Sequence, residues 1–174
     1  MRAGPILAGL ILLTPAAAAA APHRTAAGPE ARLRRLEDIE QIRTLLVDYG
    51  RSLDRRDWAA YAALFAREGE WVGGFGTAKG PAAIEAMMRK GVGGAANDDP
   101  QRNFHLLTNF EIQADGDHGR AWSRWSFVAE GPDGRAQVLY AGRYDDVLVR
   151  EDGRWKFERR TVTGDLPGAP RPPG

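Results

Sequence analysis

The 174-residue chain contains no cysteine. This absence excludes disulfide bonds, cysteine nucleophiles, zinc sites built on thiolates and lipid attachment at a cysteine. It also suits an oxidising compartment, where a free thiol would be a liability. Of the three histidines, we expect one to be available as a ligand, so a metal centre is not expected and no cofactor is predicted.

The chain also lacks an excess of charge of either sign. Lys and Arg number 24 against 23 Asp and Glu, which leaves a formal net charge of +1. Such a balance offers no clustered positive surface, so nucleic acid is not expected as a partner. Apolar residues make up 43% of the sequence, as in a globular protein, and the length suggests one domain.

No apolar run near the N-terminus is long enough to span a bilayer comfortably. The strongest run, residues 6–13, follows Arg2 and precedes the small residues 16–21, which is the order of a secretory signal peptide. We therefore predict a cleaved signal peptide over residues 1–21, no stable membrane anchor after cleavage, and a periplasmic or secreted protein. An uncleaved membrane anchor is the alternative.

The rest of the chain divides into a leader, a domain and a tail. We expect residues 22–32 to be a flexible leader and residues 33–165 to form one domain. Residues 166–174, LPGAPRPPG, form a proline-rich tail that cannot continue a helix or a central strand, so we expect it to be disordered.

Helical spacing dominates the first part of the domain. Apolar residues recur at intervals of three and four over residues 33–53, which predicts a long amphipathic helix. A shorter helix is predicted over residues 58–65 with Asp57 as its N-cap. Residues 70–72 are typical of a short strand, and a third helix is predicted to start at Pro81.

After a loop rich in Gly, Asn and Asp at residues 91–100, the apolar period changes to two. Turn sequences separate the strand candidates, which are residues 104–114, 120–130, 136–149 and 155–163. Helices followed by an antiparallel meander predict an α+β fold rather than a parallel βαβ fold. A curved sheet around the long helix would place several bulky side chains around a cavity.

His105 is the candidate base, because neutral imidazole is available near pH 7. His23 falls in the leader and His118 in a turn. A single strand histidine is more often structural or exposed, so its role stays open on the residues alone. By alternation, His105 shares a strand face with Leu107, Asn109 and Glu111.

Asp54 ends the first predicted helix, one turn after Gly50. Gly inside a helix costs about 1 kcal/mol relative to Ala, and the close approach of a strand, a ligand or another side chain would explain it. On the residues alone, an exposed Asp54 paired with Arg51 or Arg55 is the favoured interpretation. Tyr49 lies on the apolar stripe, with its hydroxyl expected at the rim of the core.

Four segments together resemble the SnoaL-like proteins of the NTF2-like superfamily. They are SLDRRDWAAYAALFAREGEW, GTAKGP, NFHLLTNFEI and GRYDDVLVREDGRWKFERR. The resemblance covers residues 36–165 and implies a cone in which N-terminal helices pack on a curved antiparallel sheet and enclose a pocket. In function, the chain looks most similar to the branch with scytalone dehydratase, bile-acid 7α-dehydratase and hexachlorocyclohexane dehydrochlorinase.

The resemblance also implies site residues. The family's catalytic histidine falls on His105 and its aspartate on Asp54. Tyr49 stands where the dehydrochlorinase has a lysine and the bile-acid dehydratase a tyrosine, and a family arginine falls on Arg160. The second acid or histidine that dehydratases carry on the next strand has no counterpart in residues 122–127, WSRWSF.

The implied activity is that of a cofactor-independent lyase or isomerase, typified by dehydration, acting on a small cyclic hydrophobic substrate. His105 would take a proton while Asp54 orients its ring. Tyr49 would donate to a leaving hydroxyl or an enolate oxygen, and Arg160 would stabilise negative charge or hold an acidic group. One alternative is a non-catalytic binding module of the same fold. A weaker one is a ketosteroid-isomerase-type enzyme with a carboxylate base.

We expect aromatic side chains and one amide to contact the ligand. These residues are Trp71, Trp125, Phe127, Tyr140 and Asn109. Ordinary core packing is the alternative for the aromatic residues. The resemblance further implies a homo-oligomer, either a trimer or a dimer.

Overall fold

A computed structural model of the chain describes residues 28–93 and 102–166. The predicted signal peptide, residues 22–27 of the leader, residues 94–101 of the loop and most of the tail lie outside the described residues. The elements, in chain order, are α1 (Pro29–Asp54), α2 (Trp58–Ala62), β1 (Phe65–Gly73), β2 (Gly76–Lys79), α3 (Pro81–Gly91), β3 (Asn103–Asp115), β4 (His118–Glu130), β5 (Ala136–Glu151) and β6 (Arg154–Gly164). This α+β order confirms the fold class predicted from the change of period.

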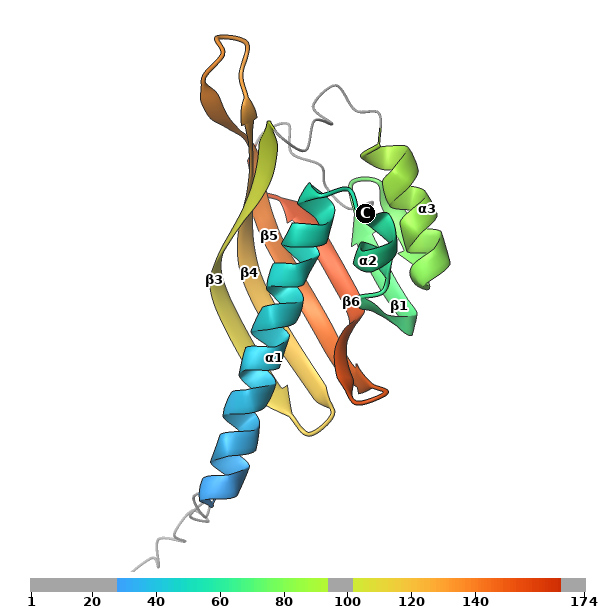
Figure 1. Cartoon of the computed structure of the whole chain (residues 1–174), viewed down its shortest axis with the longest axis vertical. Coiled ribbons are helices and arrows are strands. Elements are labelled where there is room, and N and C mark those ends of the chain that lie inside the picture. Colours follow the sequence, from blue (N-terminus) through green and yellow to red (C-terminus); the bar gives the residue numbers. More distant parts are fainter. Residues whose placement is uncertain (1–27, 94–101, 167–174) are drawn as a thin grey trace, which may run out of the picture.

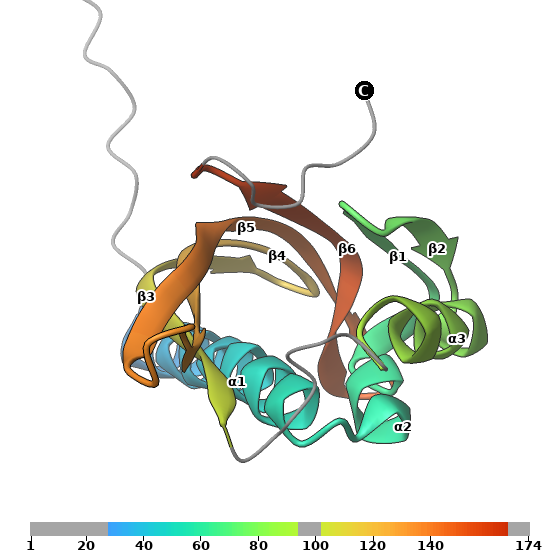
Figure 2. The same cartoon turned by 90° about the horizontal axis from the view of Figure 1, so that it is seen from above.

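The six strands form one sheet in the order β2-β1-β6-β5-β4-β3. The long strands β3 to β6 make the predicted antiparallel meander. The sheet as a whole is mixed, however, because β1 pairs with β6 in parallel. Figure 2 shows that the sheet curves around α1 without closing, and that α2 and α3 lie at the β1–β2 end.

The long helix α1 packs its apolar stripe against the inner face of the sheet (Figure 1). It begins at Pro29, before the predicted start at Leu33, because proline fits the first helical turn. A Cβ added at Gly50 would lie 3.0 Å from Leu107 of β3. The close approach of a strand therefore explains this glycine. No helix in the described part of the chain is long and apolar enough to cross a membrane.

The segment after α1 differs from the prediction in two details. Asp57 is the N-cap of α2 as predicted, and its carboxylate accepts from the amide of Ala60 at 3.0 Å. The helix ends at Ala62, and Phe65 already belongs to β1. The short strand β2 was not predicted, because the glycines around residues 73–76 form a hairpin turn and do not end the pairing.

A bulge in β3 changes which side chains face inward. Asn109 has φ of 55°, and the register with β4 shifts around it. His105 and Leu107 face the interior before the bulge, and Phe110 does so after it. The predicted alternation is therefore wrong past Leu107, because asparagine tolerates positive φ and the extra residue inverts the faces. Asn109 is exposed, so it does not join the residues expected to contact a ligand.

Candidate functional site

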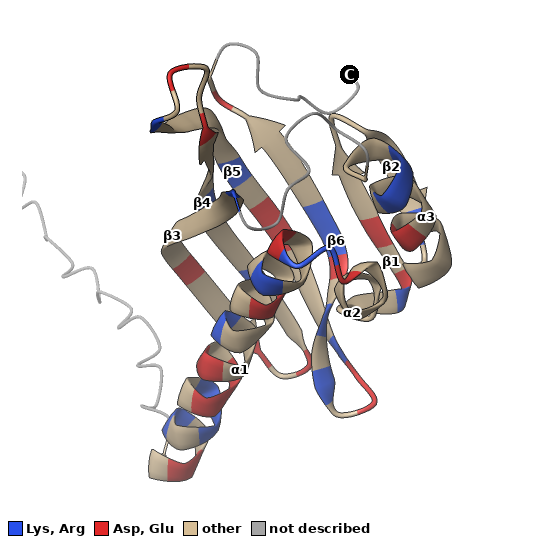
Figure 3. Cartoon of the chain, turned by 45° about the horizontal axis from the view of Figure 1, so that its top comes forward, with Lys and Arg blue, Asp and Glu red and all other residues tan. Residues whose placement is uncertain are grey.

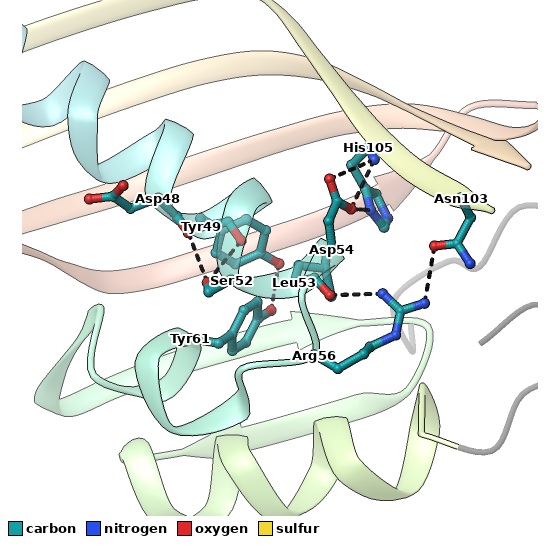
Figure 4. Close-up of polar contacts among 9 residues, drawn as sticks. All are labelled: Asp48, Tyr49, Ser52, Leu53, Asp54, Arg56, Tyr61, Asn103 and His105. Atoms are coloured by element: carbon teal, nitrogen blue, oxygen red, sulfur yellow. Dashed lines mark hydrogen bonds and ion pairs between the residues drawn. The ribbon is translucent and has the colours of Figure 1, made fainter. Parts of the chain in front are cut away.

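Asp54 and His105 meet where the end of α1 lies beside the start of β3 (Figure 4). Nδ1 of the His105 ring lies 2.7 Å from Oδ1 of Asp54. The backbone amide of His105 also donates to both carboxylate oxygens, at 2.9 and 3.1 Å. One carboxylate thus holds the ring and the backbone of the same histidine, which fixes the position of both groups.

The contact with Asp54 sets which nitrogen of the His105 ring carries the proton. When Nδ1 donates its proton to Asp54, Nε2 is left as the acceptor, which is the form that a general base needs. The side chains of His105 and Asp54 are 13% and 24% exposed, so they are mostly enclosed yet reachable. The simpler interpretation was an exposed Asp54 paired with Arg51 or Arg55. The Asp54 side chain is instead 24% exposed and contacts His105, while Arg51 pairs with Asp48 at 2.7 Å.

Arg56, which was not predicted as a site residue, connects the two elements that carry the pair. Its guanidinium donates to the carbonyl oxygen of Leu53 at 2.8 Å and to Oδ1 of Asn103 at 3.1 Å. It therefore caps the end of α1 and at the same time holds the first residue of β3. An arginine two residues past the end of a helix is the sequence signal that could have indicated this role.

Aromatic rings cover the inner face of the sheet beside His105. The ring of Phe127 lies 5.0 Å and that of Trp125 6.4 Å from the His105 ring, centroid to centroid. Tyr140 stacks on Phe127 at 6.1 Å, and Tyr144 stacks on Trp125 at 5.9 Å. Three of the residues predicted to contact a ligand thus lie next to the histidine or one ring beyond it.

The hydroxyl oxygen of Tyr49 accepts two hydrogen bonds. The Tyr61 hydroxyl donates at 2.6 Å and the indole N–H of Trp71 at 3.2 Å. Burial raises the pKa of Tyr61 well above its usual value, so Tyr61 remains a neutral donor. Tyr49 is itself only 2% exposed, so its hydroxyl lies inside the core and not at the rim as predicted. Because its oxygen accepts both of these bonds, its own proton is left for a third group. Trp71, predicted as a lining residue, is 3% exposed and serves mainly to hold this tyrosine.

Arg160 lies fully buried in the core and pairs with Asp146, which was not predicted as a site residue. Its Nε and Nη2 donate to the two carboxylate oxygens, both at 2.7 Å. The two residues are cross-strand neighbours on β6 and β5. The alternation of Asp146 with the buried Tyr144 and Leu148 was the signal that could have revealed it.

Three aromatic rings enclose the guanidinium of Arg160. Its central carbon lies 3.8 Å from the ring centroid of Tyr49, 4.1 Å from that of Phe157 and 4.2 Å from that of Tyr144. Nη1 is buried without a hydrogen-bond partner among the described atoms. Asp146 already occupies one edge of the guanidinium, so the geometry favours a core ion pair over the predicted grip on an acidic substrate group.

Burial and the charge of the partner shift the pKa of each of these two groups in opposite directions. Burial alone would lower the pKa of Arg160. The charge and hydrogen bonds of Asp146, together with Tyr49 and Tyr144, outweigh it, and the net shift is upward. Burial raises the pKa of Asp146, and Arg160 opposes that rise. We interpret the two groups as a salt bridge whose charges compensate one another inside the core.

The inner face of β4 carries no acid and no histidine. Its inward positions are Ala121, Ser123, Trp125 and Phe127. Ser123 is fully buried, and its hydroxyl has no hydrogen-bond partner among the described atoms. The second acid or base of dehydratases is thus absent from the inner face of this strand. Among the described residues, no group of three or more His, Asp or Glu is arranged to hold a metal ion.

The sequence pattern of the SnoaL-like domain matches residues 34–161. The chain therefore belongs to the SnoaL-like domain family. No curated protein matches it. Among solved structures, it resembles an NTF2-like protein with a cystatin-like fold from Novosphingobium aromaticivorans. That protein is 25% identical with a TM-score of 0.67, and the match covers 84% of this chain and 94% of that one.

Two further solved structures carry different descriptions. A type 2 hexachlorocyclohexane dehydrochlorinase is 21% identical with a TM-score of 0.66, and the match covers 82% of this chain and 93% of that one. A protein of unknown function from Mycobacterium tuberculosis is 22% identical with a TM-score of 0.63, covering 81% and 78%. Identities this low show the shared fold, which supports several chemistries.

Proposed function

We propose that the chain is a cofactor-independent lyase or isomerase that removes a proton from a small cyclic hydrophobic substrate. The observation that carries this proposal is the contact of 2.7 Å between Nδ1 of His105 and Asp54. A general base positioned in this way typically accelerates proton transfer 10²–10⁴-fold. The aromatic rings of Phe127 and Trp125 beside the histidine supply a surface suited to an apolar ring.

In the proposed reaction, Nε2 of His105 takes a proton from a carbon next to a carbonyl group. Asp54 keeps the ring oriented and stabilises the imidazolium that forms. The Tyr49 hydroxyl, whose oxygen accepts bonds from Tyr61 and Trp71, donates to the enolate oxygen or to a leaving hydroxyl. The imidazolium then returns the proton to another carbon in an isomerisation, or gives it to the departing hydroxyl, which leaves as water, in a dehydration. Both routes return His105 to its neutral form.

Isomerisation fits the site better than a dehydration that needs a second acid or base on β4. The inward side chains of that strand are Ala121, Ser123, Trp125 and Phe127. In an isomerisation one histidine both takes and returns the proton, so no second group is required. We therefore place substrates with an acidic C–H next to a ketone first in a screen, and cyclic hydroxy-ketones second.

The experiment is deuterium exchange followed by NMR. Cyclic ketones and hydroxy-ketones are incubated with the protein in D₂O, and incorporation at the carbon next to the carbonyl is measured over time. The His105→Ala variant should lose at least a factor of about 100 in exchange rate. His118→Ala, at an exposed position beside the β3–β4 turn, is the matched control and should keep the rate. Unchanged exchange by His105→Ala would disprove the mechanism.

A non-catalytic binding module is the second candidate, and the absence of an acid or histidine from the inner face of β4 favours it. Such a protein would retain a small hydrophobic molecule unaltered. If a ligand binds but no deuterium enters it and no product appears during long incubation, the binding module is the correct assignment.

We further propose that the protein is exported by the signal peptide over residues 1–21 and acts in the periplasm or outside the cell. The sequence order of Arg2, an apolar run and small residues supports this proposal. N-terminal sequencing of the protein from periplasmic and culture fractions tests it. A mature N-terminus near residue 22 is expected, and full-length protein confined to the cytoplasm would contradict export.

A further inference from the structure

The first part of α1 extends beyond the sheet. In Figure 1 the blue end of the helix projects past the strands, and Figure 3 shows charged bands of both signs along it. Every residue from Glu30 to Glu37 is exposed. Helical segments of this length are marginal when they stand alone in water, so a partner that packs on this part of α1 would stabilise it.

The side of α1 that faces away from the sheet carries a second seam, in which three of five positions are apolar and exposed. Leu33, Leu36 and Val47 are 57%, 63% and 42% exposed. A coiled coil has its a and d positions at alternating intervals of three and four residues. On α1 this pattern gives positions 33, 36, 40, 43 and 47, and the three apolar residues occupy the first two and the last. Glu40 and Arg43 fill the two intermediate positions and form an ion pair at 3.3 Å. The seam extends for about 21 Å.

Charged residues flank this seam in a self-complementary way. Arg32 precedes Leu33 and takes the g position, and Glu37 follows Leu36 and takes the e position; both are exposed. In a parallel pair of helices, the g position of one helix lies beside the next e position of the other. Arg32 would then face Glu37 of a second copy. An antiparallel pair would instead bring like charges together.

We propose that the N-terminal part of α1 is a self-association surface on which α1 of a second copy packs in parallel. Leu33 and Leu36 form its apolar centre, Val47 extends it, and the Arg32–Glu37 pairing sets the direction. The opposite face of α1, with Ile42 and Leu46, is buried against the sheet. The two domains would therefore lie on opposite sides of the helix pair. This surface does not depend on the proposed enzyme activity.

The test is a charge exchange in the mature full chain, with association measured by sedimentation equilibrium. Arg32→Glu alone and Glu37→Arg alone should each weaken self-association at least tenfold, because like charges then face each other. An equimolar mixture of the two variants should associate again, since each supplies the charge that the other lacks. The matched control is Arg34→Glu, which makes the same charge change off the seam and should associate like the unchanged chain.

A second pair of variants tests whether the copies associate through α1 or through the sheet. Leu36→Asp should abolish association, whereas Phe104→Asp, at a 49% exposed position on β3, should leave it unchanged. The proposal fails if the unchanged chain is monomeric at high micromolar concentration, or if Phe104→Asp is the variant that dissociates it. It also fails if the equimolar mixture of Arg32→Glu and Glu37→Arg does not associate. In that case the exposed seam of α1 contacts something other than α1 of a second copy.

Discussion

The molecule contains two acid–base pairs with the same contact distance and opposite environments. Asp54 and His105 approach to 2.7 Å with side chains 24% and 13% exposed. Asp146 and Arg160 also approach to 2.7 Å, but both side chains are fully buried. Distance alone therefore does not identify a reactive pair. The accessible pair contains an imidazole, which can accept and release a proton, and the enclosed pair contains a guanidinium, which stays charged.

The two pairs also differ in what surrounds them. His105 has aromatic rings on one side, and its side chain keeps 13% of its surface exposed. Arg160 has rings above and beside it and a carboxylate along its edge. We infer that the first pair performs chemistry, and that the second stabilises the position of the Tyr49 ring above it.

The largest expected effect concerns the accessible pair. Asp54→Asn should reduce the rate of deuterium exchange about 10²–10⁴-fold, because an amide can donate to Nδ1 and hold the wrong ring tautomer. The fold should persist, since the oxygen of the substituted side chain can still accept from the backbone amide of His105. Exchange rates with the substrate found in the screen, together with urea unfolding, measure both effects. A fully active variant would remove Asp54 from the mechanism.

The next effect concerns the buried pair. Asp146→Ala should lower the free energy of unfolding by about 3–5 kcal/mol, because Arg160 remains buried without its counterion. Urea unfolding measures the change. The exposed partner of Arg124, Asp165, provides the control, and Asp165→Ala should cost at most about 1 kcal/mol.

If Asp146→Ala does not fold, a double variant still tests the idea. Asp146→Leu with Arg160→Met removes both charges and keeps the volume apolar, so most of the lost stability should return. If the double variant is no more stable than Asp146→Ala, the attraction between the two charges stabilises the fold by more than the cost of burying them.

The buried tyrosines near Arg160 should make the free energy of unfolding fall as the pH becomes alkaline. Burial raises the pKa of Tyr61 and of Tyr144 well above the usual value of 10.0. Their contribution is complete below pH 10 and is lost as the pH rises, because the unfolded chain releases these protons first. Each tyrosine should add a slope of about 1.4 kcal/mol per pH unit. In urea unfolding between pH 9 and 11, Tyr61→Phe should show a shallower slope, and an identical slope would contradict the assignment.

The smallest effect concerns the approach of β3 to α1 beside the accessible pair. Gly50→Ala gains about 1 kcal/mol of helix propensity but places a methyl group 3.0 Å from Leu107. The net change in the free energy of unfolding should stay within about 1 kcal/mol. Combining Gly50→Ala with Leu107→Val should make the helix gain visible in urea unfolding. A single variant that loses several kcal/mol would show that Leu107 cannot shift.

Sequence patterns predicted the elements better than the faces they present. The period change at the start of β3 depends only on local spacing, and the turn sequences between the long strands depend only on local conformation. The inversion at Asn109 could not be read from alternation, because one bulged residue reverses every later face of the strand. The parallel pairing of β1 with β6 joins segments far apart in the chain.

For the candidate site, the sequence indicated which residues could take part, but not which of them would contact one another. His105 is the one histidine in a predicted strand, and family resemblance added Asp54. Neither observation fixes the hydrogen bonds that the two residues make. Asp146 was overlooked because a charged residue in a strand is usually exposed, and its burial became evident only with Arg160 beside it.

The sequence by itself determined the α+β class, the amphipathic helix and the residues able to transfer a proton, because these follow from local periodicity and side-chain chemistry. Tertiary structure decided which carboxylate meets the histidine and which is sealed in the core. It also decided which apolar residues of α1 stay exposed. The reason is physical: burial and pairing depend on contacts between segments distant in sequence, and these contacts set which charged groups remain in reach of water and of a bound molecule.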